Sequence, residues 1–242
     1  MEGKMVDWKR CHGWMKYDSL DVNLALSGSF TIGYRFKDGF DEWTRRFNGF
    51  KNGNQAARKG GKNLMTVAIP HLLENMKVDK LKMAFVPALT SREERASNEG
   101  VLSWIAEFCG EYFSNADFAR EAIRKDAHES LRPHNIAKRQ VILDAANFRA
   151  GRIDAEIIFV IDDFITTGST LSRIARTIRA SNREVEYIYG IAFGKNETLE
   201  FHRNRHNTEL TNDHVPDEWA DEWKRGEKAN ELPTSDRFAW RP

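Results

Sequence analysis

The segment "IIFVIDDFITTGST", residues 157–170, constrains the fold of this chain more than any other stretch of its 242 residues. It opens with an apolar run that does not alternate with polar residues, which is typical of a parallel strand buried on both faces. Two adjacent carboxylates, Asp162 and Asp163, end the run. A strand buried on both faces needs helices on each side of the sheet, so the segment predicts an α/β fold.

The neighbouring segments repeat the order of strand, loop and helix. Residues 81–87 ("LKMAFVP") predict a buried strand, a polar loop follows, and residues 101–113 show helical spacing of apolar side chains. A second helix begins near residue 169, and a further strand is expected over 184–194. The predicted buried face of that second helix is Leu171, Ile174, Ala175 and Ile178. Two such units and a following strand predict a mostly parallel sheet with helices on both faces.

Upstream of these units, the pattern predicts a strand pair and two helices. Residues 22–40 alternate around a turn at Ser27-Gly28, which indicates two short strands. Residues 41–53 predict a helix whose aromatic side chains Trp43, Phe47 and Phe50 share one face. Residues 63–77 predict another helix, with Pro70 as a kink or a break.

Two regions differ in character from this core. Residues 114–150 are polar and basic and are expected to form largely a mobile loop. The C-terminal part is polar, but it carries a short predicted helix with Trp219 and Trp223 on one face, which either docks onto its own domain or binds a partner. We expect an N-terminal extension or hood over 1–45, a core over 46–194 and a tail over 195–242.

Composition limits the class of protein. Apolar residues make up 40% of the chain and charged residues 30%, which is ordinary for a soluble globular protein. No apolar run approaches the roughly 18–20 residues that a membrane span needs, and the N-terminus lacks the apolar core of a secretory signal. We therefore expect a cytoplasmic protein with no membrane partner. Cys11 and Cys109 fit neither a disulfide framework nor a zinc site.

Charge is unevenly distributed along the chain. From Arg35 to Lys62 there are eight basic residues and three acidic ones, whereas from Lys195 onward there are eight basic and eleven acidic. The basic segment is interleaved with aromatic residues, which suits phosphate-bearing partners such as nucleic acid. The simpler interpretation is a solvated helix face above a packed aromatic stripe.

The end of the strand at Asp163 combines carboxylates with a turn suited to anions. Ligands of open α/β sheets bind beyond the carboxyl ends of the strands. Two adjacent carboxylates repel each other there, and a diol or a hydrated Mg²⁺ would compensate. The turn that follows leads into a helix N-terminus, which favours a phosphate, and consists of Thr166, Thr167, Gly168, Ser169 and Thr170. Helix capping explains one of its hydroxyl groups but not four, so we predict a sugar-phosphate site.

The stretch "VIDDFITTGST", residues 160–170, resembles the signature of type I phosphoribosyltransferases. The resemblance implies that family's fold, a mostly parallel sheet flanked by helices. It also implies that Asp162 and Asp163 hold the ribose hydroxyls of phosphoribosyl pyrophosphate (PRPP). Thr166, Thr167, Gly168, Ser169 and Thr170 would then bind its 5-phosphate. Mg²⁺ would reach Asp162 or Asp163 directly or through water.

A second resemblance points to the competence-associated, ComF-like branch of that family. Residues 85–100 ("FVPALTSREERASNEG") are similar to its loop after the first core strand, and the likeness extends over about 47–194. The four-cysteine zinc site that many members carry near the N-terminus is not encoded in this sequence. The resemblance implies a pyrophosphate-binding loop formed by Thr90, Ser91, Arg92 and Arg95. Alternatively, these arginines form surface ion pairs with Glu93 and Glu94.

The resemblance also implies a mobile catalytic loop, for which Lys125–Gln140 is the candidate, with Arg132 and Arg139 joining the aspartates as catalytic residues. The alternative is an ordinary exposed basic loop. The implied activity is transfer of ribosyl 5-phosphate from Mg²⁺-PRPP to a nitrogen acceptor with release of pyrophosphate. Many members of the family are homodimers, so the resemblance also makes a homodimer possible. Two other functions stay open: a non-catalytic module that senses PRPP or nucleotides, and an accessory or effector protein of DNA uptake or bacterial defence, working with nucleic acid or a protein partner.

Overall fold

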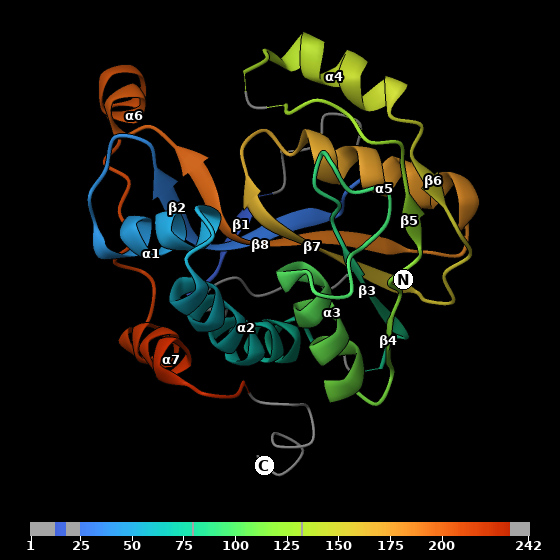
Figure 1. The fold of residues 1–242 in the computed structure, drawn as a ribbon, viewed down its shortest axis with the longest axis horizontal. Coiled ribbons are helices and arrows are strands. Elements are labelled where there is room, and N and C mark those ends of the chain that lie inside the picture. Colours follow the sequence, from blue (N-terminus) through green and yellow to red (C-terminus); the bar gives the residue numbers. More distant parts are fainter. Residues whose placement is uncertain (1–12, 18–24, 79, 132, 233–242) are drawn as a thin grey trace. The chain divides into compact units, whose positions relative to one another are not determined.

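The computed structural model of this chain describes residues 13–17, 25–78, 80–131 and 133–232. Its main sheet is mostly parallel, is flanked by helices and has the strand order β1-β2-β8-β7-β3-β4 (Figure 1). This confirms the α/β class and the mostly parallel sheet. The six strands are β1 (Met15–Tyr17), β2 (Gly28–Phe36), β3 (Met83–Pro87), β4 (Ala116–Phe118), β7 (Ile157–Ile165) and β8 (Tyr187–Glu197).

The chain divides into two compact units, each built from separate stretches of sequence. One contains Met1–Lys16, Thr31–Lys80 and Phe193–Pro242, and the other contains Tyr17–Phe30 and Leu81–Ala192. Strands β2 and β8 each pass from one unit into the other. The units do not follow the expected boundaries at 45/46 and 194/195, because the C-terminal segment belongs with residues 31–80 instead of forming a tail of its own.

In the unit that contains residues 81–192, β3 pairs in parallel with β7 and with β4. The register joins Met83 to Ile157 and Pro87 to Ile161. All five residues of β3 and the first five of β7 are buried, which confirms the prediction from the unbroken apolar run. Helix α3 (Val101–Tyr112) covers one face of these strands, and α5 (Ser169–Ser181) covers the other (Figure 1).

Helix α5 follows the sequence pattern closely. The four side chains predicted for its inner face are all buried at 1% exposure or less: Leu171, Ile174, Ala175 and Ile178. They recur at the spacing that places residues on one face of a helix. The helix is therefore held by the core of its unit, and its first residue is fixed directly after the end of β7.

Residues 114–150 contain more structure than predicted. Besides β4, they form β5 (Ile123–Arg124) and β6 (Arg149–Ala150), which pair antiparallel, and helix α4 (Ile136–Ala145). The proposed mobile loop Lys125–Gln140 is therefore partly helix, which corrects that expectation. The pattern was hard to recognise because the apolar residues Val141, Ile142 and Leu143 are consecutive and form no one-sided stripe; Ile142 and Leu143 are buried, whereas Val141 is exposed.

The other unit contains α1 (Glu42–Lys51), α2 (Gln55–Met76), α6 (Leu199–His206) and α7 (Asp217–Lys228). Helix α1 confirms its prediction: Asp41 caps it by accepting the Thr44 N–H at 3.0 Å. Helix α2 continues through Pro70, so the predicted break is wrong. Its buried side chains Ile69 and Leu72 hold the helix by packing even though Pro70 donates no hydrogen bond.

The predicted strand pair around Ser27-Gly28 is also wrong in its described part. Strand β2 begins at Gly28 and runs on to Phe36, whereas Ala25–Ser27 form no strand. Residues 18–24, where most of the other strand was expected, lie outside the described residues. The alternation that follows Ser27 belongs to one long strand, β2, and most of the side chains of this strand are buried.

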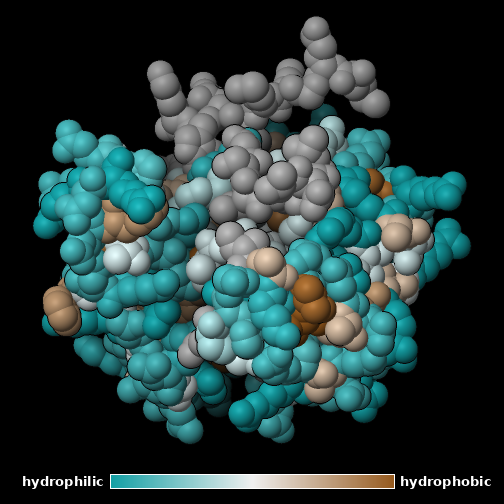
Figure 2. All heavy atoms as spheres, turned by 90° about the horizontal axis from the view of Figure 1, so that it is seen from above, coloured by the Kyte–Doolittle hydropathy of each residue, from teal (hydrophilic) through white to brown (hydrophobic). Residues whose placement is uncertain are grey.

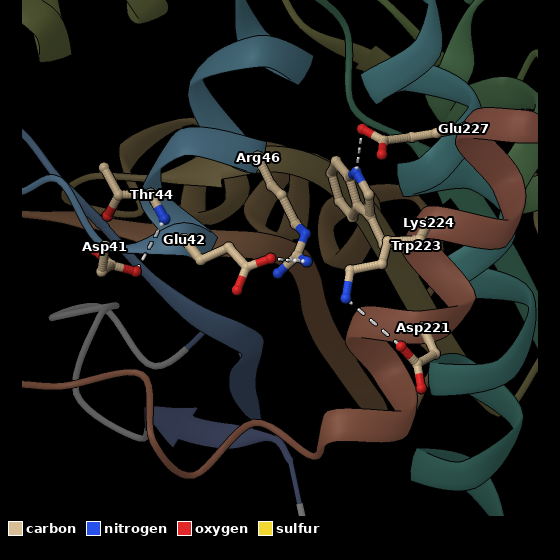
Figure 3. Close-up of polar contacts among 8 residues, drawn as sticks. All are labelled: Asp41, Glu42, Thr44, Arg46, Asp221, Trp223, Lys224 and Glu227. Carbon is tan, nitrogen blue, oxygen red and sulfur yellow. Dashed lines mark hydrogen bonds and ion pairs between the residues drawn. The ribbon is translucent and has the colours of Figure 1, made fainter.

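Helix α7 docks onto its own unit, as the first interpretation of its tryptophans predicted. Trp219 and Trp223 are 5% and 0% exposed. The Trp223 ring contacts three aromatic residues of α1, all of the predicted stripe: Trp43, Phe47 and Phe50. Its indole N–H donates to Glu227 at 3.0 Å (Figure 3). These two side chains are therefore core residues and not a surface for a partner.

The basic segment 35–62 does not form a single solvated face. Arg46 is buried, pairs with Glu42 on its own helix and lies with its guanidinium 4.7 Å from the centre of the Trp43 ring (Figure 3). Arg35 donates to Asn48 and Asn196. The Lys59 ammonium group also donates to the Ala229 carbonyl, at 3.2 Å, so at least three of the eight basic residues are tied into the unit, which weakens the case for an electrostatic nucleic-acid surface there.

No helix within the described ranges is long and apolar enough to cross a membrane. Most of the coloured surface in Figure 2 is hydrophilic, and its hydrophobic residues form small separate areas. Large, continuous apolar patches usually mark a permanent interface. The coloured part of this face therefore carries no patch of that kind.

Candidate functional site

The turn between β7 and α5 is shaped for an anion. Gly168 is the N-cap residue of α5 and has φ +74°, a left-handed conformation that favours glycine. Glycine has no side chain to accept hydrogen bonds from the first turn, so α5 carries no side-chain cap. Ser and Thr therefore do not act as the cap at this position, and the positive end of the helix dipole faces the turn.

A small pocket lies at this turn. Its volume is about 110 Å³, and its lining includes all five residues predicted for phosphate binding, together with three others: Leu131, Arg139 and Leu171. On this measure a cavity of about 10–15 Å³ holds one water molecule, so the pocket has room for a group of several non-hydrogen atoms, such as a small tetrahedral oxyanion. The hydroxyl groups of Thr167 and Ser169 lie 2.8 Å apart within it. Hydroxyl donors and helix N–H groups thus meet in one concave site.

Arg139 brings a positive charge to the pocket from a different element, α4. Its Nε donates to the carbonyl oxygens of Leu131 at 3.0 Å and His134 at 2.8 Å. These bonds tie the loop before α4 to the first turns of that helix, and Leu131 is itself part of the pocket lining. Arg132, the other arginine predicted here, lies outside the described residues.

Helix α4 is fastened to α5 by polar side chains. Arg173 of α5 donates to Asp144 of α4 at 2.6 Å, and Gln140 donates to the same carboxylate at 3.0 Å. Arg173 lies four residues after Ser169, the first residue of α5. The Asp144–Arg173 ion pair therefore holds α4, and with it Arg139, beside the turn between β7 and α5.

Asp162 and Asp163 lie within the last residues of β7, just before the turn. Both are half-buried. Asp162 accepts the Asp163 N–H at 2.8 Å, and Asp163 accepts the Phe164 N–H at 2.6 Å, which orients each carboxylate along its own main chain. They do not line the pocket of the turn. The structure thus brings the five turn residues and Arg139 together, with the carboxylates adjacent along the chain.

Asp162 and Asp163 are the candidate metal ligands of this site. In the described part of the chain, no group of three His, Cys, Asp or Glu side chains gathers closely enough to hold a metal ion. Mg²⁺ commonly binds one or two carboxylates and takes its other ligands from substrate phosphates and water. Asp162 and Asp163 are two carboxylates of the type that Mg²⁺ binds in this way.

The loop after β3 lies at the same edge of the sheet as the turn after β7, because the two strands are parallel neighbours (Figure 1). The Ala88 N–H donates to the Ile161 carbonyl at 2.8 Å and joins the two strand ends. Of the residues predicted to bind pyrophosphate, three are exposed and Ser91 is half-buried; the exposed ones are Thr90, Arg92 and Arg95.

The alternative interpretation of this loop, ion pairs of its arginines with Glu93 and Glu94, is not seen among the described residues. Glu93 instead accepts the Thr90 N–H at 2.8 Å. Across the described residues, neither Arg92 nor Arg95 makes an ion pair with a carboxylate. Both guanidinium groups are therefore exposed cations at the carboxyl end of β3, a position where ligands of α/β sheets bind.

Lys125 is a residue of this region that sequence reasoning missed. It is only 1% exposed, and its ammonium group donates to the carbonyl oxygens of Ser91 at 3.1 Å and Asp126 at 3.3 Å. Burial lowers the pKa of Lys125, while the nearby carboxylates of Glu93, Glu94 and Asp126 act in the opposite direction. The surrounding polar sequence gave no sign of burial, because a lysine in such a segment is normally exposed.

Comparison of the chain with models of protein families and with curated proteins finds no match in either case.

Proposed function

We propose that the protein binds Mg²⁺-PRPP and transfers its ribosyl 5-phosphate group to a nitrogen acceptor, releasing pyrophosphate. One observation carries this proposal: a pocket of oxyanion size is lined by Thr166–Thr170 and by Arg139, directly after two adjacent carboxylates at a strand end. The residue types match the resemblance of residues 160–170 to the phosphoribosyltransferase signature, and the geometry suits the same ligand.

The 5-phosphate would occupy the pocket. The N–H groups at the start of α5 donate to its oxygens, and the helix dipole favours its charge. The hydroxyl groups of Thr167 and Ser169 are within reach of the same oxygens. Arg139 adds a full positive charge, and its donation to two carbonyl oxygens holds the side chain in place before a ligand arrives. This end of the substrate is bound and does not react.

The ribose would lie toward the carboxylates. Asp162 and Asp163 accept hydrogen bonds from the two ribose hydroxyls, which orients the ring and places its anomeric carbon away from the 5-phosphate. A Mg²⁺ ion bound to the substrate would neutralise charge on the pyrophosphate, with Asp162 or Asp163 as its protein ligand, directly or through water.

The reacting bond is the one between the anomeric carbon and pyrophosphate. As it breaks, its electron pair leaves with the pyrophosphate and the ribose gains oxocarbenium character. The loop after β3 would bind the departing group through its N–H groups, the hydroxyls of Thr90 and Ser91 and the cations Arg92 and Arg95. The acceptor nitrogen then bonds to the anomeric carbon and loses its proton to water. No described residue identifies which nitrogen compound this is.

Turnover tests the proposal. Purified protein with Mg²⁺ and PRPP is incubated with a panel of nucleobases, amines and ammonia, and pyrophosphate release is measured. We expect release that depends on one class of acceptor and falls at least tenfold in Arg139→Met. Arg183→Met, a charge change at an exposed position of the same unit, is the matched control. Binding of PRPP without release by any acceptor would instead support the sensing module.

A further inference from the structure

The buried lysine has an unusual set of partners. An ammonium group removed from water normally pairs with a carboxylate, because burying a charge alone is costly. Lys125 instead donates to two main-chain carbonyl oxygens, those of Ser91 and Asp126. The buried ammonium group of Lys125 thus holds the Ser91 carbonyl of the loop after β3. Lys125 itself lies in the segment that follows β5.

The Ser91 carbonyl receives a second donor from the same segment. The His128 N–H donates to it at 2.8 Å, and the Lys125 N–H donates to the Glu94 carbonyl at 3.0 Å. Three hydrogen bonds therefore join residues 125–128 to residues 91–94, and two of them converge on one oxygen. A carbonyl held by two donors has little freedom to rotate.

Peptide geometry carries this constraint to the next residue. The peptide group is planar, and in its trans form the carbonyl and the following N–H point in opposite directions. Fixing the Ser91 carbonyl toward Lys125 therefore aims the Arg92 N–H away from it. Within the described part of the chain, the Arg92 N–H has no hydrogen-bond acceptor, and Arg92 itself is exposed. The loop presents an oriented donor at the carboxyl end of β3.

We propose that Lys125 is a positioning residue: it fixes the Ser91–Arg92 peptide so that the Arg92 N–H binds the pyrophosphate group of the substrate. The inference rests on the proposed function, and it names which main-chain donor recognises the leaving group and what orients it. Lys125 acts through Ser91 and does not touch the substrate. An exposed lysine could not do this, because solvent would compete for its protons.

Binding of the two halves of the substrate separates this role from simple stabilisation. Inorganic pyrophosphate and ribose 5-phosphate, each with Mg²⁺, are titrated into the wild type and into Lys125→Met. The control is Lys82→Met, which replaces an exposed lysine that forms a surface pair with Asp154. We expect Lys125→Met to weaken pyrophosphate binding at least tenfold and to change ribose 5-phosphate binding less than twofold. Lys82→Met should leave both unchanged.

The Arg92 amide resonance provides the direct readout. In the wild type, pyrophosphate should shift it strongly, and in Lys125→Met the shift should be lost while the amides of α3 keep their positions. If Lys125→Met does not fold, Lys125→Arg retains the charge with different geometry and should show the same selective loss.

Each outcome has one meaning. A wild type that binds neither ligand contradicts the proposed function. A wild type that binds both, with Lys125→Met and Lys125→Arg binding pyrophosphate normally, overturns the role of Lys125 alone. Equal weakening of both ligands also overturns it, since that would be a structural effect.

Discussion

At the scale of single residues, Gly168 decides whether the turn between β7 and α5 can form. Its φ of +74° is strained for any residue with a Cβ. Gly168→Ala should lower the free energy of unfolding by about 1–2 kcal/mol and weaken ribose 5-phosphate binding severalfold. Denaturant unfolding and calorimetry check both effects. Gly151→Ala is the control, because an added Cβ there meets nothing within 4 Å. Equal effects of the two substitutions would contradict this account of the turn.

Lys125 should make stability depend on pH. Burial lowers its pKa in the folded protein below the ordinary value of 10.5, so between these two values the unfolded chain binds more protons than the folded one. The contribution of Lys125 to the free energy of unfolding should therefore increase with pH between these two pKa values, by at most about 1.4 kcal/mol per pH unit.

Urea unfolding of the wild type and Lys125→Met between pH 7 and 10 measures this contribution as the difference between two curves. The free energy of unfolding of the wild type should increase relative to that of Lys125→Met as pH rises. The reason is that Lys125 loses its proton, so the folded protein no longer buries a charge. A difference in stability that does not change with pH would mean that Lys125 has the same pKa in the folded and the unfolded protein, which would contradict this prediction.

At the scale of elements, the placement of α4 should matter more for binding than for stability. Asp144→Ala removes the carboxylate that receives both Arg173 and Gln140. Partly exposed pairs of this kind contribute about 1 kcal/mol or less to stability. We expect the KM for PRPP to rise several-fold, since α4 carries Arg139, with little change in Tm. Glu184→Ala, an exposed acid elsewhere in the same unit, should change neither. A lower Tm with an unchanged KM would refute this role of α4.

The packing of α7 on α2 depends on a glycine. A Cβ at Gly226 would lie 2.7 Å from the Lys59 carbonyl oxygen and 2.5 Å from the Asn63 Cβ, so the helices would have to separate. Gly226→Ala should cost about 1–3 kcal/mol of stability, as overpacking does, although alanine favours helix formation. Thermal unfolding, compared with that of Glu218→Ala on the exposed first turn of α7, provides the measurement. A more stable variant would show that propensity outweighs the close approach.

Sequence predicts best those elements whose pattern is set by burial. The unbroken apolar run of β7, the inner face of α5 and the aromatic stripe of α1 each follow directly from which side chains leave water. Helix α4 was not predicted because its apolar residues at 141–143 are consecutive instead of spaced along one face, and Pro70 suggested a break that packing overrides. Lys125 was missed for a related reason: its burial results from contacts between residues 91–94 and 125–128, which no local pattern records.

At the scale of the whole molecule, residues far apart in sequence assemble each unit. The C-terminal segment was expected to be a separate tail, yet Trp223 lies at the centre of an aromatic cluster with residues of α1. Such non-local assembly depends on side-chain complementarity between segments, which periodicity within one segment does not reveal. The order of site residues along 162–170 was predictable because all of them lie in one continuous stretch.

The central claim is that this stretch binds PRPP. Calorimetric titration of Mg²⁺-PRPP into the wild type and into the double variant Asp162→Asn with Asp163→Asn tests it most directly, with circular dichroism and Tm confirming the fold of both proteins. We predict saturable binding to the wild type and a loss of at least 100-fold in affinity in the folded double variant. Equal affinity in the two proteins, or no binding to the wild type, would contradict the account.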